Sequence, residues 1–266
     1  EQAQYHLQTM ISPFVLRRLK KDVLKDLPDK LEEVYYAEAT PSQKELYDAR
    51  VQRMKQMINS ASDKEFKQDK IKILAELTRL RQLCCNPSLI YEDYVNGSGK
   101  EDMCIDLIRR AVEGGHKILL FSQFTSMLDL LCKRLEKEHI PFYLLVGSTP
   151  KAKRAQLVEQ FQQDSVPVFC ISLKAGGTGL NLTAADIVIH YDPWWNTAVE
   201  NQASDRAHRI GQKNAVTIYR LILKDTIEER ILALQQEKSG LASRFLDNES
   251  ISSSSLSRED LLKLLD

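Results

Sequence analysis

The chain has 266 residues, 43% of them hydrophobic, which is enough to bury the core of one large domain or of two modest ones. Lys plus Arg and Asp plus Glu both number 37, so no overall charge attracts the chain to nucleic acid or to an anionic membrane. The sequence has neither a run of 18 apolar residues nor a signal-peptide pattern, so a membrane span or export is not indicated. We expect the five cysteines, which include the adjacent Cys84 and Cys85, to be reduced and mostly in the core.

The first third of the chain predicts helices. Apolar and charged residues alternate at helical spacing over residues 16–25, and a short β-compatible run, Leu31 to Ala37, follows. Thr40 can cap a helix in which Pro41 occupies the first helical position, where a missing N–H costs no hydrogen bond. We expect that helix to run past Met57.

The pattern changes at a turn-rich segment, residues 95–100. Before it, leucine spacing between residues 71 and 83 predicts a helix that ends before Pro87. After it, short apolar runs alternate with amphipathic helical patterns, which is typical of a parallel sheet covered on both faces. The predicted strands are 117–121, 142–146, 166–172, 186–191 and 215–222, with helices at 127–137 and 151–163, a further helix from about 226 to 238 and a short final helix capped by Ser257. The fold class is therefore α/β, RecA-like or Rossmann-like.

A glycine-rich segment, residues 172–182, follows one predicted strand. Open α/β sheets bind ligands at the carboxyl ends of their strands. Gly176, Gly177 and Gly179 would let the backbone amides approach a phosphate of a nucleotide or of DNA, and Lys174 adds a positive charge. The alternative is a tight turn that needs positive φ angles.

Two adjacent tryptophans, Trp194 and Trp195, follow the next predicted strand. Both cannot point into one core, so at least one should be partly exposed and able to stack against a sugar or base. The alternative is that both pack under a loop.

The third segment is rich in arginine. In a helix, Gln202, Arg206 and Arg209 would share one face, and the two guanidiniums would form a fork suited to phosphate oxygens. The alternative is a solvated arginine stripe, or salt bridges to Asp205 and Glu200.

In this order and spacing, the three segments resemble motifs V and VI of the superfamily-two helicases, and specifically of their Swi/Snf branch of DNA-dependent ATPases. Residues 174–182 and 205–212 are close to signatures of that branch. Residues 13–23, 80–87 and 117–125 extend the resemblance, the last of them resembling motif IV. The resemblance implies a second RecA-like lobe in four segments. Residues 1–40 would form the linker from the first lobe and the entry to lobe two, and residues 41–96 a helical insertion. Residues 97–225 would form the RecA-like parallel sheet flanked by helices, and residues 226–266 a C-terminal brace helix and tail.

The resemblance also implies roles for single residues. Arg206 and Arg209 would be arginine fingers on the γ-phosphate of ATP, supported by Gln202, and Gly177 and Gly179 would couple the nucleotide to DNA. The residues implied to face the DNA backbone, or to couple it to the nucleotide, are Gln123, Thr149, Arg154, Lys174, Thr178, Asn181 and Trp195.

The sequence also lacks parts that this family needs. The Gly99-Lys100 pair is not a P-loop, because Tyr94 and Glu101 stand where Gly and Ser or Thr are required. The resemblance implies that ATP and Mg²⁺ are held mainly by a first lobe of the same polypeptide, and that double-stranded DNA is bound without sequence preference. We therefore expect the chain alone not to hydrolyse ATP, and its start at Glu1 suggests a piece of a longer protein.

Two other functions stay open at this point. One is a stand-alone DNA- or protein-binding module, which the intact arginine pair disfavours. The other is an RNA helicase lobe, which the helical insertion disfavours. The tail, residues 260–266, favours a bacterial cytoplasm over a nucleus.

Overall fold

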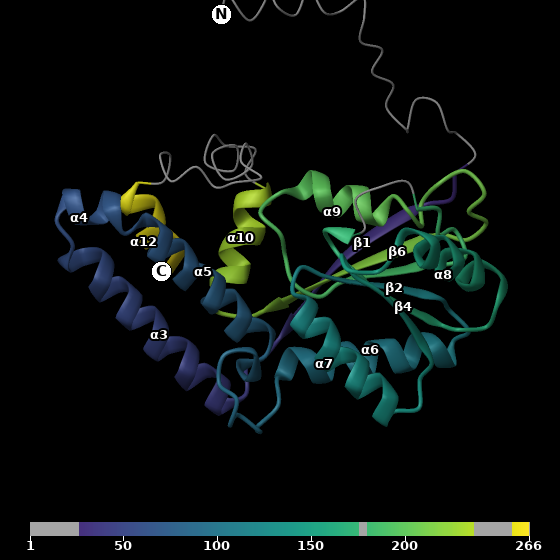
Figure 1. The fold of residues 1–266 in the computed structure, drawn as a ribbon, viewed down its shortest axis with the longest axis horizontal. Coiled ribbons are helices and arrows are strands. Elements are labelled where there is room, and N and C mark those ends of the chain that lie inside the picture. The colour runs from purple at the N-terminus through teal and green to yellow at the C-terminus, as the bar shows by residue number, and fades with distance from the viewer. Residues whose placement is uncertain (1–26, 176–179, 237–256, 266) are drawn as a thin grey trace, which may run out of the picture.

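The computed structural model describes residues 27–175, 180–236 and 257–265. They form a six-stranded parallel sheet with helices on both faces, and a second group of helices packs beside the sheet (Figure 1). The five predicted strands are confirmed within two residues of their predicted bounds, and with them the α/β class. Among the residues described, no helix has the length and apolar character needed to cross a bilayer.

The strand order is β1-β6-β5-β2-β4-β3, and all neighbours are parallel. The strands are β1 (Lys30–Ala37), β2 (Ile118–Ser122), β3 (Phe142–Leu145), β4 (Val168–Ser172), β5 (Ile187–His190) and β6 (Val216–Leu223). Strand β1 pairs with β6 along its whole length, from Lys30 opposite Val216 to Ala37 opposite Leu223. The segment 1–40, predicted as a linker, therefore supplies one edge strand of the sheet.

Four helices cover the sheet. Helices α6 (Gly99–Glu113) and α7 (Thr125–Lys137) lie on one face, and α8 (Lys151–Gln163) and α9 (Thr197–Ser204) on the other (Figure 1). Alternate residues of β2 show why both faces are apolar. Leu120 packs with α6 and α7, whereas Leu119 and Phe121 pack with Phe161 of α8. A strand that is buried on both faces has apolar residues at nearly every position, and the sequences of these strands show such runs.

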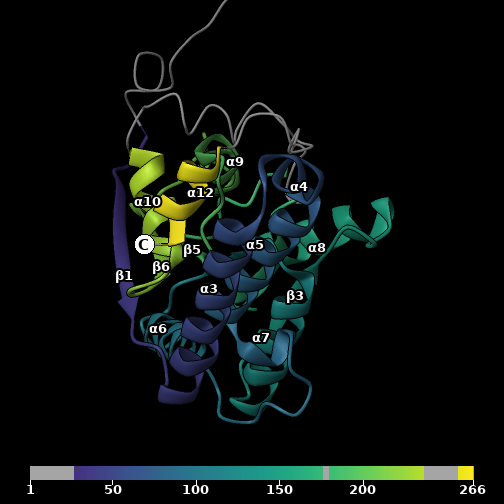
Figure 2. The ribbon, with the colours of Figure 1, turned by 90° about the vertical axis from the view of Figure 1, so that its left-hand side faces the viewer.

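The remaining helices form a separate core. They are α3 (Pro41–Ser60), α4 (Asp63–Gln68), α5 (Lys70–Cys85), α10 (Ile227–Gln236) and α12 (Arg258–Leu265). Figure 2 shows them side by side in front of the sheet. Tyr47, Leu80, Ile231 and Leu264 share their apolar cluster. The helices described within segment 226–266, predicted as a brace and tail, thus pack on α3 and α5, which lie in the segment 41–96 predicted as a helical insertion.

Local signals at the helix ends are confirmed. The Thr40 side chain accepts a hydrogen bond from the Gln43 amide, at 3.2 Å, and Pro41 opens α3. Ser257 accepts from the Asp260 amide, at 3.1 Å, and so caps α12. The predicted helix at 16–25 lies outside the described residues. All five cysteines are buried free thiols, as predicted.

Candidate functional site

The arginine segment is a turn rather than a helix face. Helix α9 ends at Ser204, with Asp205 as its C-cap, and the chain then turns as far as Gly211, whose φ is 101°. Gln202 lies in the last turn of α9 with an exposed side chain. The prediction of one helical face carrying Gln202, Arg206 and Arg209 is therefore wrong.

Arg206 is buried, with 1% of its surface exposed. Its Nε and Nη1 atoms have no hydrogen-bond partner among the described residues. Burial, and after it the positive charge of Arg209, lower the pKa of Arg206 to about 10, so the guanidinium is charged at neutral pH. A buried charge without partners is costly, and an anion placed against it would remove that cost. The alternative of a solvated stripe is wrong for Arg206.

The backbone joins the arginine turn to the end of the glycine-rich segment. The Leu182 amide donates to the Arg206 carbonyl at 3.0 Å, and Arg209 Nη1 donates to the Leu180 carbonyl at 3.3 Å. Arg209 is half-buried, and its Nε also donates to the Asp205 carbonyl, at 3.0 Å. The two segments that the resemblance pairs as motifs V and VI therefore lie side by side.

Three residues predicted in the glycine-rich segment lie outside the described residues. They are Gly177, Thr178 and Gly179, and Gly176, the other glycine named in this segment, lies outside as well.

Gln212 fixes the end of the arginine turn, a role that the sequence did not predict. Its Nε2 donates to the carbonyls of Thr183, Ala185 and Ala207, at 3.1, 2.8 and 3.0 Å. Its Oε1 accepts from the amides of the two residues that follow it, both at 2.9 Å. One buried side chain thus ties the turn to the segment before β5. Its place at the end of the signature 205–212 was the available signal.

Glu200 does not pair with these arginines. Its carboxylate accepts from the Trp194 amide at 2.6 Å and from Arg220 Nε at 3.3 Å. The predicted alternative of a salt bridge from the arginines to Glu200 is therefore wrong.

The other predicted site residues follow the carboxyl ends of the strands. Gln123 follows β2, Thr149 and Arg154 follow β3, Lys174 follows β4 and Trp195 follows β5. Ser122 lies opposite Ser172, and Phe121 opposite His190, so these strand ends are level in the sheet. The loops that follow these strands, and the start of α8 that carries Arg154, therefore lie at one edge.

These side chains differ in what they contact. Arg154, in the first turn of α8, donates to the carbonyls of Thr149 and Gly147, both at 2.7 Å, so its guanidinium supports the loop between β3 and α8. Thr149 accepts from the Val146 amide. Gln123 is half-buried, and its Oε1 has no hydrogen-bond partner within the described part of the chain. Lys174 is exposed at the sheet edge, and Asn181, beyond the glycines, is exposed as well.

The two tryptophans pack against different cores. Trp194 contacts the cluster under α8 and α9, whereas Trp195 contacts the helical cluster that contains α3 and α5. Both are half-buried, which confirms that they do not share one core and that at least one is partly exposed.

The described residues suit an anion better than a metal ion. Among them, no group of three or more His, Cys, Asp or Glu side chains could hold a metal. Arg206, by contrast, presents unpaired guanidinium donors that fit a phosphate.

Comparison with known proteins shows the family to which the chain is related. Residues 99–211 match the family model of the helicase conserved C-terminal domain, and residues 1–89 match that of the SNF2-related domain. The C-terminal domain of the Sulfolobus solfataricus SWI2/SNF2 ATPase aligns with a TM-score of 0.72 and 33% identity, over 89% of this chain and 98% of that domain. The chain belongs to the SWI2/SNF2 family of ATPases. Its predicted RecA-like helicase C-terminal lobe is thereby confirmed.

Other SWI2/SNF2 relatives match nearly the whole chain. The Sulfolobus solfataricus SWI2/SNF2 ATPase core in complex with dsDNA aligns with a TM-score of 0.72 and 35% identity, over 99% of this chain and 56% of that one. The putative ATP-dependent helicase/translocase YwqA of Bacillus subtilis is 40% identical over 91% of this chain and 27% of its own length. The chain spans about a quarter of the length of the curated relatives it matches.

Proposed function

We propose that this SWI2/SNF2 chain is the second motor lobe of an ATP-dependent translocase on double-stranded DNA. In this proposal Arg206 and Arg209, supported by Gln202, act on the γ-phosphate of ATP, and residues at the strand ends contact the DNA backbone. The observation that carries the proposal is Arg206, which is buried beside the glycine-rich segment with two nitrogens unpartnered among the described residues.

A purely structural arginine does not account for this arrangement. An unsatisfied buried donor costs roughly 1–3 kcal/mol. A structural arginine such as Arg220 reduces this cost, because its guanidinium donates to the carboxylates of both Glu32 and Glu200. Phosphate oxygens accept from a planar guanidinium in a forked geometry, so they would supply what Arg206 lacks.

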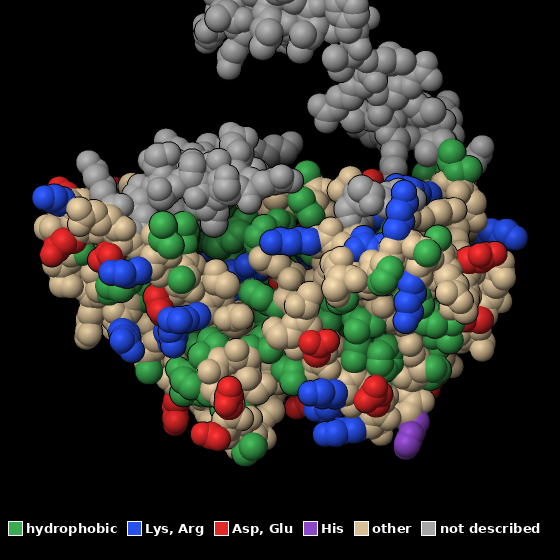
Figure 3. All heavy atoms as spheres, viewed as in Figure 1, with side chains coloured by type: hydrophobic (Ala, Val, Ile, Leu, Met, Phe, Trp, Pro, Cys, Tyr) green, Lys and Arg blue, Asp and Glu red, His purple; other side chains and the backbone are tan. Residues whose placement is uncertain are grey.

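The proposed DNA contacts involve few charges. Net charge is zero, and basic and acidic side chains are interspersed on the face in Figure 3. Binding through backbone phosphates at Lys174 and its neighbours would therefore be weak and independent of sequence. A motor that steps along DNA must tolerate every base. That a family member was solved as an ATPase core with dsDNA supports this ligand.

In this proposal the first motor lobe is the partner that supplies the nucleotide-binding and metal-binding groups. The 266 residues contain no P-loop, and the described residues include no metal-binding cluster, so we assign ATP and Mg²⁺ mainly to the first lobe of the same polypeptide. The bacterial relatives among the matches support a bacterial cytoplasm as its location.

The test is ATP turnover in the polypeptide that joins the first lobe to these 266 residues. Arg206→Ala and Arg209→Ala should each lower turnover by roughly 10³ to 10⁵, the range for removal of an arginine finger. ATP affinity should fall much less, because the first lobe supplies most of the binding. Arg→Lys should not restore turnover, since an ammonium lacks the planar fork. Lys213→Ala, which removes an exposed cation just beyond the turn, is the control.

Stability separates the two interpretations of Arg206. If it holds phosphate, Arg206→Ala should leave the melting temperature unchanged or raise it, because the variant loses a buried unpaired charge. Normal turnover in a folded Arg209→Ala protein would reject the arginine-finger assignment. The 266-residue chain alone should show no turnover with or without DNA.

A further inference from the structure

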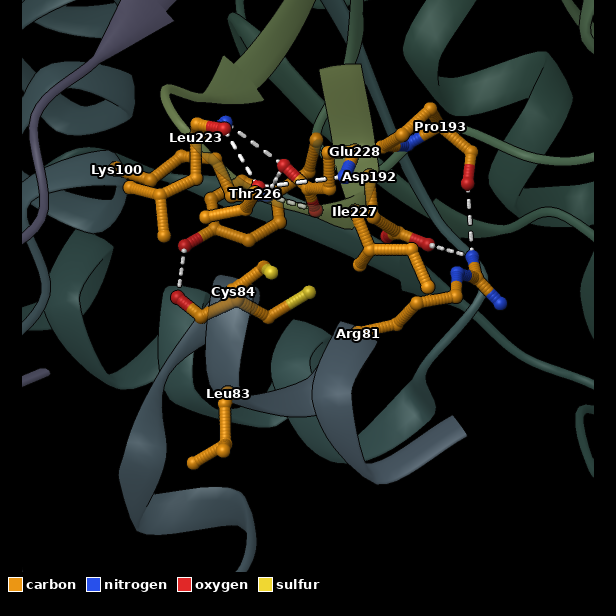
Figure 4. Close-up of polar contacts among 12 residues, drawn as sticks. Arg81, Leu83, Cys84, Lys100, Asp192, Pro193, Leu223, Thr226, Ile227 and Glu228 are labelled. Atoms are coloured by element: carbon orange, nitrogen blue, oxygen red, sulfur yellow. Dashed lines mark hydrogen bonds and ion pairs between the residues drawn. The ribbon is translucent and has the colours of Figure 1, made fainter. Parts of the chain in front are cut away.

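A buried arginine of the helical insertion reaches the loop that carries the two tryptophans. Arg81 lies on α5 and is 2% exposed, whereas Arg79 on the same helix is half-exposed. Arg81 Nη2 donates to the Pro193 carbonyl at 2.8 Å and lies 3.4 Å from Asp192 Oδ2 (Figure 4). This contact joins residues that are more than 100 positions apart in the chain.

Three aromatic rings surround the same guanidinium. Arg81 Cζ lies 5.1 Å from the ring centroid of Trp194, 5.2 Å from that of Phe124 and 5.9 Å from that of Trp195. A guanidinium within about 6 Å of an aromatic face is attracted by the ring quadrupole and can stack on it. Phe124 follows β2 and the tryptophans follow β5, so the arginine contacts two loops of the same sheet edge.

Asp192 completes the link. Its Oδ1 accepts from Ser122 Oγ at 2.5 Å and from the Gln123 amide at 3.2 Å. The carboxylate that faces Arg81 thus also fixes the loop after β2. One ion pair from the helical insertion therefore restrains both Gln123 and the tryptophan loop.

The rest of α5 does not need a charge at this position. Its buried residues Ile73, Leu77, Leu80 and Leu83 belong to an apolar cluster. Arg81 Nε is buried without a hydrogen-bond partner among the described residues, so the hydrogen bonds of the guanidinium run through Nη2 to the loop after β5. Its contacts converge on the two loops.

We propose that Arg81 is a positioning residue, which holds the Trp194-Trp195 loop and the Gln123 loop in the orientation that contacts DNA. The inference rests on the proposed function, because it assumes that this edge binds the DNA backbone. Through Arg81, the helical insertion sets the DNA affinity of the sheet edge without touching DNA itself. The planar guanidinium is essential, since it stacks on the rings and pairs with Asp192 at once.

The chain provides its own spectroscopic probe. Trp194 and Trp195 are the only two tryptophans in the sequence, and both rings lie within 6 Å of the Arg81 guanidinium, so intrinsic tryptophan fluorescence reports on the surroundings of Arg81. Arg81→Met and Arg81→Lys in the 266-residue chain should make the tryptophans more accessible to acrylamide. Arg79→Met, which removes an exposed arginine two residues away, should not. Circular dichroism establishes that each variant is folded. If Arg81→Met does not fold, Arg81→Lys makes the same test, because it retains a cation for Asp192.

DNA affinity is then measured by anisotropy of a labelled random-sequence duplex at low salt. Arg81→Met and Arg81→Lys should weaken binding about tenfold, as expected for one lost stacking contact. Trp195→Ala should weaken it similarly, and the double variant should lose less affinity than the two single effects multiplied, because both changes disturb the Trp195 contact. If Arg81 were merely structural, its replacement would lower the melting temperature, and the effects of the Arg81 and Trp195 changes on DNA affinity would be independent.

The outcomes separate the inference from the proposed function. If the wild-type chain binds the duplex and Trp195→Ala weakens it, but the folded Arg81 variants bind normally, Arg81 has no positioning role. The same conclusion follows if the effects of Arg81→Met and Trp195→Ala add. If the wild-type chain shows no salt-dependent DNA binding at all, the proposed function fails whatever the Arg81 variants do.

Discussion

Lys100 and Glu228 form an ion pair from which water is excluded. Lys100 Nζ lies 2.5 Å from Oε1 and 2.7 Å from Oε2 of Glu228, and both side chains are fully buried (Figure 4). Burial lowers the pKa of Lys100, but the charge of Glu228 outweighs this and holds the pKa above its ordinary value. Glu228 Oε2 also accepts from the Leu223 amide. The pair joins the first turn of α6 to the first turn of α10.

Breaking this pair from one side should be strongly destabilising. Lys100→Met leaves a buried carboxylate without its cation, and we expect a loss of about 3–5 kcal/mol in the free energy of unfolding, measured in urea at pH 7. Arg79→Met removes an exposed partner of Glu76 and should cost under about 1 kcal/mol. The double variant Lys100→Met/Glu228→Leu should recover much of the loss. Equal effects of Lys100→Met and Arg79→Met would contradict this account.

His190 should make the fold less stable in mild acid. The ring is buried, stacks on Phe121 and lies 2.8 Å from Ser204 Oγ. Burial, and after it the positive charge of Arg220, lower the pKa of His190 to about 3. Between the unfolded value of about 6.5 and this value the unfolded chain binds a proton that the folded chain does not, so stability falls as pH falls.

The measurement compares wild type with His190→Gln. The stability advantage of wild type should shrink by about 2 kcal/mol between pH 7 and pH 5, at up to about 1.4 kcal/mol per pH unit below 6.5. Urea unfolding at the two pH values decides the point. An advantage that stays constant would mean that His190 titrates alike in the folded and unfolded chain.

Gln212 should not tolerate a carboxylate. Gln212→Glu would keep the acceptor for the two following amides but would turn an oxygen towards three backbone carbonyls. We expect a loss of at least about 1–3 kcal/mol, the cost of unsatisfied buried polar groups. Thermal unfolding against Gln163→Glu, an exposed glutamine of α8, measures it. A variant as stable as this control would show that the turn does not depend on Gln212.

Lys174 should act on DNA as a point charge. Lys174→Ala should weaken binding to all duplex sequences equally and reduce the slope of log affinity against log salt by about 1. Anisotropy titrations at several salt concentrations, with two unrelated duplexes, test both statements. A loss confined to one duplex would indicate base recognition and would contradict a translocase.

The sheet strands were predictable because burial on both faces makes them continuous apolar runs, as in Val168–Ser172. The edge strand β1 was harder to place. It gave a β-compatible pattern, but its pairing with β6 depends on contacts across most of the chain. A local sequence pattern cannot show this pairing, because most of the chain lies between the two strands.

The arginine segment shows why spacing alone misleads. Arg206 and Arg209 have helical spacing, yet the helix ends at Ser204 because Gln212 and Leu182 bind the backbone in a turn. Those are tertiary contacts, which helical periodicity does not contain. Arg81 was missed for a related reason. The sequence pattern predicts that an arginine between leucines on a helix is exposed to solvent. The aromatic partners of Arg81 come from loops elsewhere in the chain, which the pattern does not include.

The parallel pairing of β1 with β6 also bears on how the protein is made. A ribosome adds about 5–20 residues per second, so the strand at Lys30 waits about 10–40 s for its neighbour at Val216 to be synthesised. Each of the three apolar clusters also includes at least one residue of β6, namely Leu223, Leu221, or Val216 with Ile218. Translation that stalls before β6 would therefore release a chain in which none of the three hydrophobic cores is closed, a natural substrate for chaperones and proteases.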